Sequence, residues 1–518
     1  MLVFSNMPNV LFLPCDTRPP TLEYVLQLGR VAGLEIKTPP LAMLNDLNIP
    51  GDTAGIAAWL LEQVPTADAL IVTLETLCLG GMIPARRVTD SLEVALERLE
   101  VLSELKRINP SLRILAYGVI VRVAHDNDPL EEKTYYGEWG EALRLVSEWT
   151  DRVERFEDAA MLETVRAVVP PEILADWLGT RERNHALHQR ALELVGDGVI
   201  EHLCLTLDDT TPYGLAARDR RRLEARAEEL GVWGRVDVYP GADEVAAVLL
   251  GRVLLSGRSP RVFVRYPSSM SEVAVMLYED RPLGELVRAH LRAAGCVQVA
   301  SLEAADFVLG VNAPSAKQAH REPDWSVVDT ASRHLWAFVE TLERDSLHKP
   351  LAIADVAYAN GAESRFTKLL LERIDVTALY GYAAWNTAGN TIGSAIGSAV
   401  TAWAAARDGR LERVRLAEAN FSRLVDDWLY QATVRSQVRV ALGNPSPFDL
   451  GDLKPLAEQE IEMRMPPLAL ELFDAYFAPR LEDVTLRWGG AGLAWPRLFT
   501  GVFRLEFHTS GMNPKLER

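Results

Sequence analysis

Two pairs of adjacent carboxylates stand out as groups that could do chemistry. Asp208 and Asp209 follow an apolar run in LCLTLDDTTPYG, and Asp243 and Glu244 follow the next apolar run in YPGADE. Like charges held close together separate their pKa values, so one carboxyl can be protonated while its neighbour is ionised. Glycoside hydrolysis needs both forms next to the scissile bond. We therefore take these four residues as candidate catalytic residues.

A divalent cation is the main chemical alternative for the same region. The segment HDND offers His125, Asp126 and Asp128, which together with Asp208 and Asp209 would form an oxygen-rich site. The sequence contains no HExxH motif, no HxH motif and no cluster of cysteines. We expect no cofactor, and a metal-dependent hydrolase stays open as an alternative.

A second group of side chains suits a sugar or another polyol. Asparagine amides both donate and accept hydrogen bonds, and an Asp–Arg pair can bind hydroxyl groups. Tryptophan and tyrosine rings can stack on a pyranose face, although core packing explains Trp385 equally well. The predicted substrate-binding residues are Asp16, Arg18, Tyr213, Asn360, Trp385, Asn386 and Asn390.

These polar residues lie at the ends of predicted strands. Apolar runs of strand length recur with amphipathic helical patterns between them, which is typical of parallel α/β proteins. In such proteins the ligand site lies at the carboxyl ends of the strands. The predicted strands are 9–14, 34–39, 69–75, 113–122, 202–209, 235–241, 261–267, 307–312, 351–358 and 379–385. The clearest predicted helices are 91–108, 244–255, 283–295 and 325–344.

Two architectures fit this order of elements. One has a barrel-like first domain and a flavodoxin-like doubly wound second domain, and the other has two doubly wound domains that face each other across a cleft. The turn SGRSP at 256–260 follows a long helix and marks a boundary. We expect an α/β domain at 1–257 with the carboxylate motifs, a second α/β domain at 258–400, and a mostly helical region at 401–518 that ends in a short strand or two.

The composition of the chain limits the kinds of partner and the cellular location that we expect for the protein. The chain has 518 residues, 48% of them hydrophobic, and its 72 acidic against 54 basic side chains give a formal net charge of -18. Such a charge disfavours nucleic-acid binding. The four cysteines are far apart, and the start MLVFSNMPNVLFLP lacks the features of a signal peptide or a membrane span. We expect a cytoplasmic protein with a small-molecule or sugar substrate and without a nucleic-acid or membrane partner. Its oligomeric state is left open.

Several motifs in order resemble one bacterial family. They are CDTRPP, LGGMIPAR, LDDTTPYG, GADEVA, YED, ADVAYANGA, AWNTAGNTIG and a closing LAWPRLF, which together extend from about residue 8 to 506. In this combination they resemble the family catalogued as domain of unknown function 4127. The resemblance implies no activity, because none is assigned to the family.

Two short motifs also resemble glycosidases. The tetrapeptide GADE is similar to the Gly-Gly-Asp-Glu of retaining β-N-acetylhexosaminidases, and this resemblance implies that Asp243 orients the acetamido group and that Glu244 is the general acid. Those enzymes usually have a histidine four residues before the aspartate, where this chain has Tyr239. The Asp208–Asp209 pair resembles a second group of substrate-assisted hexosaminidases. An ordinary helix start also explains GADEVAAVLL.

The sequence therefore predicts a glycosidase-like hydrolase of carbohydrate metabolism, with N-acetylated hexosaminides as the first candidate substrates. A non-catalytic protein that binds a sugar or another metabolite is the alternative beside the metal-dependent hydrolase. If the glycosidase hypothesis is correct, the carboxylates should lie about 5 to 10 Å apart.

Overall fold

The computed structural model describes residues 7–156, 159–320, 333–446 and 448–509. The chain forms two compact units. The first contains residues up to Leu26, Leu34–Ser256 and Tyr278–Ala293, and the second contains Gln27–Gly33, Gly257–Leu277 and the chain from Ala294 onward. The chain thus passes from one unit to the other inside the SGRSP turn, and its carboxyl-terminal helices belong to the second unit.

The first unit is built on an open sheet of six parallel strands in the order β2-β1-β3-β4-β5-β6. The first five follow the flavodoxin-like order, and β6 extends the sheet. The barrel alternative is wrong, because β2 and β6 each pair with a single neighbour in this sheet and leave it open. The strands are β1 (Val10–Leu13), β2 (Ile36–Lys37), β3 (Ala69–Thr73), β4 (Arg113–Ile120), β5 (His202–Leu207) and β6 (Val236–Pro240).

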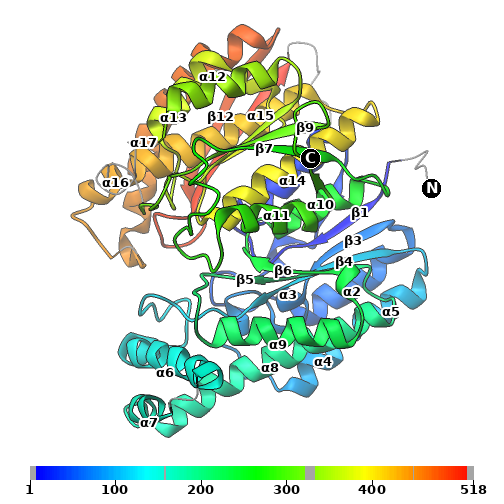
Figure 1. Ribbon diagram of the computed structural model, residues 1–518, viewed down its shortest axis with the longest axis vertical. Helices are drawn as coiled ribbons and strands as arrows, with labels where there is room; N and C mark the ends of the chain where they lie inside the picture. The colour runs from blue at the N-terminus through cyan, green and yellow to red at the C-terminus, as the bar shows by residue number, and fades with distance from the viewer. Residues whose placement is uncertain (1–6, 157–158, 321–332, 447, 510–518) are drawn as a thin grey trace. The chain divides into compact units, whose positions relative to one another are not determined.

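Helices cover both faces of this sheet. Figure 1 shows α8 and α9 on one side of it and α10 and α11 on the other. Such cover requires strands that are apolar on both faces, and β1, β3, β5 and β6 are buried along their whole length. The helices from the amino terminus to α11 are α1 (Glu23–Val31), α2 (Thr53–Gln63), α3 (Leu74–Leu79), α4 (Leu92–Leu99), α5 (Val101–Ile108), α6 (Tyr136–Phe156), α7 (Ala160–Arg166), α8 (Pro171–Gly196), α9 (Leu215–Glu229), α10 (Val245–Leu254) and α11 (Leu283–Ala293).

The second unit contains a sheet of five parallel strands in the order β11-β10-β9-β7-β8. Counted within this unit, the order is again 2-1-3-4-5, so the predicted flavodoxin-like doubly wound fold is confirmed. The strands are β7 (Arg261–Arg265), β8 (Val297–Gln298), β9 (Phe307–Asn312), β10 (Leu351–Asp355) and β11 (Gly381–Ala383).

The carboxyl-terminal region is mostly helical, as predicted, and ends in an antiparallel hairpin. Its helices and the hairpin share one hydrophobic core with β9, β10, α12 and α13, which explains why they belong to the second unit. The elements are α12 (Leu335–Ser346), α13 (Ser364–Arg373), α14 (Ala388–Arg407), α15 (Arg413–Arg423), the π-helix η6 (Leu424–Val434), α16 (Arg435–Ala441), α17 (Lys454–Leu472), β12 (Val484–Leu493) and β13 (Gly501–Thr509).

All ten predicted strands are present. The only strand of the two parallel sheets without a prediction is β8, which is two residues long and exposed. The predicted helix at 91–108 is two helices, α4 and α5, which meet at Glu100. The helix predicted at 325–344 begins at Leu335, and residues 325–332 lie outside the described part of the chain.

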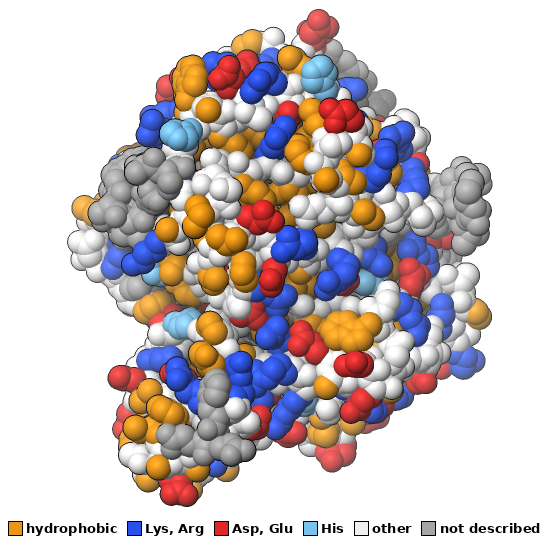
Figure 2. Space-filling model, in the orientation of Figure 1, with side chains coloured by type: hydrophobic (Ala, Val, Ile, Leu, Met, Phe, Trp, Pro, Cys, Tyr) orange, Lys and Arg blue, Asp and Glu red, His pale blue; other side chains and the backbone are white. Residues whose placement is uncertain are grey.

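The surface carries charges of both signs. In Figure 2, basic and acidic side chains are interspersed on the face that is shown. On α9, Arg221 pairs with Asp151, and Arg226 pairs with Glu193. Among the described residues, no helix combines the length and the apolar character that crossing a membrane requires.

Candidate functional site

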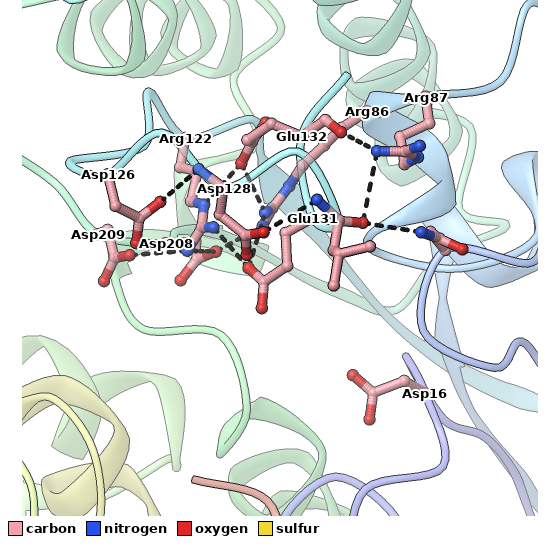
Figure 3. A network of polar contacts seen from close by, with 12 residues as sticks. Asp16, Arg86, Arg87, Arg122, Asp126, Asp128, Glu131, Glu132, Asp208 and Asp209 are labelled. Atoms are coloured by element: carbon pink, nitrogen blue, oxygen red, sulfur yellow. Dashed lines mark hydrogen bonds and ion pairs between the residues drawn. The ribbon is translucent and has the colours of Figure 1, made fainter. Parts of the chain in front are cut away.

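A buried network of ion pairs lies at the carboxyl end of the first sheet (Figure 3). It joins two arginines to four carboxylates, and these six residues come from three segments that lie far apart in the sequence. We call this set the arginine–carboxylate network, and its members are Arg86, Arg122, Glu131, Glu132, Asp208 and Asp209. This edge of a parallel sheet is where α/β proteins bind ligands.

Arg86 connects Glu132 with Asp208. It belongs to the short 3-10 helix η3 (Pro84–Arg86), and only 3% of its side chain is exposed. One guanidinium nitrogen lies 3.0 Å from Glu132 Oε1, and the other lies 2.6 Å from Asp208 Oδ2. Both contacts are charge-assisted hydrogen bonds, which are stronger than bonds between neutral groups.

Arg122 connects Glu131 and Glu132 with Asp209. It follows β4, and its Nε, Nη1 and Nη2 each bind a different carboxylate. The distances are 2.9 Å to Glu132 Oε1, 2.9 Å to Asp209 Oδ2 and 2.5 Å to Glu131 Oε2. Because Glu132 binds both arginines, the network is continuous from Asp208 to Asp209 (Figure 3).

The two aspartates of the network follow β5 directly, and their side chains point toward different arginines. Asp209 has a φ of 42°, a left-handed conformation that is uncommon for residues other than glycine. Asp208 thereby reaches Arg86, while Asp209 reaches Arg122. Their side chains are 16% and 22% exposed, which makes them the more accessible aspartates of the candidate set.

The charges of the network do not balance, since four carboxylates share two guanidinium groups. Burial and the neighbouring Asp208 raise the pKa of Asp209 from its ordinary 3.8 to about 7, although Arg122 opposes the shift. Burial and Asp209 in turn raise the pKa of Tyr278 to about 12. A carboxyl with a pKa near neutrality can both release and accept a proton.

A second cluster ties the loop after β6 to the loop after β1. Arg18 binds Asp16 at 2.7 Å through Nη2 and Asp243 at 2.5 Å through the same nitrogen. All three side chains are nearly fully buried. Thr21 donates a further hydrogen bond of 2.5 Å to Asp16. The predicted Asp16–Arg18 pair is thus present, and it also holds Asp243.

The two clusters affect each other electrostatically. Burial, together with the neighbouring charges of Asp16 and Asp208, raises the pKa of Asp243 to about 6 against the opposing charge of Arg18. The influence of Asp208 means that the carboxylates of both motifs contribute to one electrostatic environment.

Glu244 is buried and bound within its own loop. Its side chain has no exposed surface, one oxygen accepts a hydrogen bond of 2.9 Å from the Ala242 N–H, and the other lies 3.2 Å from His290 Nε2. Gly241, with a φ of 149°, makes this loop possible, because a Cβ there would lie 2.1 Å from the carboxylate. Glu244 therefore stabilises the start of α10.

Asp126 and Asp128 of the HDND segment lie near Asp208 and Asp209 in Figure 3, but within the described part of the chain no three of these groups bring their ligand atoms within 4.8 Å of one another. Asp128 accepts a hydrogen bond from the Leu130 N–H, and the His125 ring lies 5.6 Å from the ring of Tyr278. Among the described residues, the one group of three candidate ligands with all ligand atoms within 4.8 Å is Cys15, Asp16 and Asp243. Arg18 already binds both aspartates of that group.

Tyr213 contacts arginines. The guanidinium groups of Arg152 and Arg155 lie 4.6 and 5.0 Å from the centre of its ring. Cation–π contacts of this kind hold an aromatic ring in place. Tyr213 therefore helps to fix the loop that follows Asp208 and Asp209.

The four other predicted binding residues belong to the second unit. Trp385 is 4% exposed and stacks on Phe499 with 5.0 Å between ring centres, which favours the core-packing interpretation. Asn390 is 3% exposed in the first turn of α14. Asn386, with a φ of 63°, and Asn360 are partly exposed in the loops that follow β11 and β10.

No pattern in the sequence predicts the roles of Arg86, Arg122, Glu131 and Glu132. Arg86 ends the motif LGGMIPAR, and Arg122 ends the predicted strand RILAYGVIVR. A basic residue at the end of a buried strand is the signal that could have identified Arg122.

Comparison with known proteins places the chain in a family. Residues 10–503 match the family described as "Protein of unknown function (DUF4127)". The chain belongs to this family. The resemblance seen in the motifs is therefore confirmed. No curated protein and no solved structure matches the chain.

Proposed function

We propose that this family member is a glycosidase-like hydrolase of carbohydrate metabolism that uses Asp209 as its general acid and Asp208 as its ionised partner. One observation supports this most: two adjacent carboxylates at the carboxyl end of the first sheet bind two different arginines. Each carboxylate thus has its own environment, and two unlike environments are what acid and base roles on one residue type require.

The chemistry of glycoside cleavage fits this pair. A general acid must be protonated near neutral pH and must reach the leaving-group oxygen. Asp209 meets the first condition through its raised pKa of about 7 and the second through its partial exposure. Asp208, held by Arg86 at 2.6 Å, would stabilise positive charge on the sugar ring or orient a substrate acetamido group.

Asp243 and Glu244 are less suitable for direct catalysis. Asp243 is 6% exposed and bound by Arg18, and Glu244 has no exposed side-chain surface. We therefore assign the acid role to the Asp208–Asp209 pair. Because adjacent aspartates resemble those of substrate-assisted hexosaminidases, N-acetylated hexosaminides are the first substrates to test.

We further propose a cytoplasmic location and a small-molecule substrate without a nucleic-acid or membrane partner. All four cysteines are buried free thiols, which suits a reducing compartment. We also propose that no cofactor takes part, since Asp208 and Asp209 each already bind an arginine side chain.

Hydrolysis of a panel of chromogenic glycosides tests the proposal. The panel includes N-acetylated hexosaminides and is run with and without a chelator. We expect turnover that survives the chelator and falls at least ~100-fold in Asp209→Asn and Asp208→Asn. Glu244→Gln is the matched control, and we expect it to lower stability rather than the chemical rate.

The alternatives predict other results. If the chelator abolishes turnover, the protein is a metal-dependent hydrolase. If the folded protein hydrolyses no member of the panel but binds one of the sugars, it is a sugar-binding protein without catalytic activity.

A further inference from the structure

One face of α8 points polar side chains at the segments that carry the arginine–carboxylate network. Arg181 donates a hydrogen bond of 3.0 Å to the carbonyl oxygen of Arg122. Arg183 and Asn184 donate to the carbonyl oxygen of Ala85, beside Arg86, at 2.6 and 3.0 Å. A single helix therefore contacts the main chain at or beside both arginines of the site.

Arg181 itself is fixed from two sides. Its side chain is 3% exposed and its Nη2 lies 2.9 Å from Asp219 on α9, while Nη1 reaches Arg122. Arg218 also binds Asp219, at 3.2 Å. A guanidinium held in this way presents its remaining N–H groups in a fixed direction.

A small cavity lies beside the residues that precede Arg122. Ile120 and Val121 line a small cavity, with room for about one water molecule, together with Arg181 and His185. Atoms that line a cavity lack packing contacts on that side. The hydrogen bond from Arg181 to the Arg122 carbonyl oxygen fixes the main chain at this point.

We propose that Arg181 is a positioning residue for the candidate acid Asp209, acting through Arg122. Arg181 fixes the main chain of Arg122, and the Arg122 side chain then holds Asp209 at 2.9 Å. This inference rests on the proposed function for the role of Asp209, but its test requires no substrate.

The pH dependence of carbodiimide labelling provides that test. Carbodiimide activates protonated carboxyls, so labelling of Asp209, located by peptide mass spectrometry in the full chain, falls as the group ionises. The charged groups that most affect the pKa of Asp209 are Asp208, Arg122, Glu131 and Arg86, and Tyr278 and Asp126 lie nearby. Of these groups, Arg181 positions Arg122, whose positive charge lowers the pKa of Asp209. If Arg122 is less firmly held, this lowering of the Asp209 pKa becomes weaker.

We expect the labelling midpoint of Asp209 to rise by about one pH unit in Arg181→Gln, the lower end of the effect of a neighbouring opposite charge. Arg181→Lys keeps the positive charge but cannot bind Asp219 and Arg122 together, so the midpoint should rise there as well. Arg190→Gln is the control, because Arg190 lies on the same helix and pairs with Glu100 and Glu193.

Two results would overturn the proposal. One is an unchanged midpoint of Asp209 labelling in folded Arg181→Gln. The other is a wild-type midpoint in Arg181→Lys, which would show that the positive charge at position 181 affects Asp209 directly and that the hydrogen bond to Arg122 is not needed. Asp219→Asn serves as a second variant if the Arg181 variants do not fold, and it should shift the midpoint in the same direction. Hydrolysis plays no part in these readouts, so they stand apart from the test of the proposed function.

Discussion

Replacing Asp209 with asparagine should stabilise the protein at alkaline pH while it removes the proposed acid. The folded state raises the pKa of Asp209 from 3.8 to about 7, because burial and Asp208 disfavour the ionised form. The stability contributed by its proton is complete below the ordinary pKa and is lost as the pH rises toward 7. An asparagine has no proton to lose.

The size of the effect follows from the shift. Between pH 5 and the folded pKa of about 7, each pH unit costs the wild type about 1.4 kcal/mol of unfolding free energy, so the total is about 3 kcal/mol. Any contribution that does not depend on pH, such as a weaker hydrogen bond to Arg122, cancels when the two pH values are compared.

Thermal unfolding at pH 5 and pH 8 measures this difference. Relative to the wild type, the midpoint of Asp209→Asn should rise by roughly 5 °C between the two pH values, at about 2 °C per kcal/mol for a unit of this size. Asp197→Asn is the control, since Asp197 is exposed at the end of α8 and should follow the wild type. A difference that stays constant with pH, or that reverses, would refute the assignment of a raised pKa.

Two pairs of substitutions test the packing within the two units. Gly118→Ala should lower the free energy of unfolding by about 1–3 kcal/mol, because the new Cβ would lie 2.7 Å from His188 Nε2. Gly179→Ala on α8 is the control, because its Cβ would meet no atom within 4 Å, and it should be neutral or stabilising. Urea unfolding measures the free energy of unfolding of both variants. Trp385→Ala should cost about 3–5 kcal/mol, while exposed Trp336→Ala should cost far less. Equal thermal midpoints for the two tryptophan variants would contradict the core position of Trp385.

The strands could be predicted because their physical signal is local. A strand buried on both faces requires a continuous apolar run, and such a run is visible without knowledge of its neighbours. The exposed two-residue β8 has no such requirement and gave no signal. The choice between barrel and open sheet depends on which strands pair at the edges, which the order of elements alone does not determine.

The site could be predicted only in part, because its partners come from distant loops. Asp208 and Asp209 can be predicted from the sequence because two charged residues directly follow the apolar run that forms the buried strand β5. Arg86 is 122 residues from Asp208, and only the folded chain brings them together. Burial is not visible in the sequence, so Glu244 is as good a catalytic candidate as Asp209 from the sequence alone, although its side chain is fully buried.

The most direct test of the account is an infrared titration of Asp209. The carbonyl stretch of a protonated carboxyl, isolated as the difference between the wild type and Asp209→Asn, reports the proton itself. We expect this band to disappear with a midpoint near pH 7, where Asp209 could act as a general acid. A band that has already disappeared at about pH 5, close to the range of ordinary carboxyls, would contradict the proposal that the Asp208–Asp209 pair divides into an acid and an ionised partner.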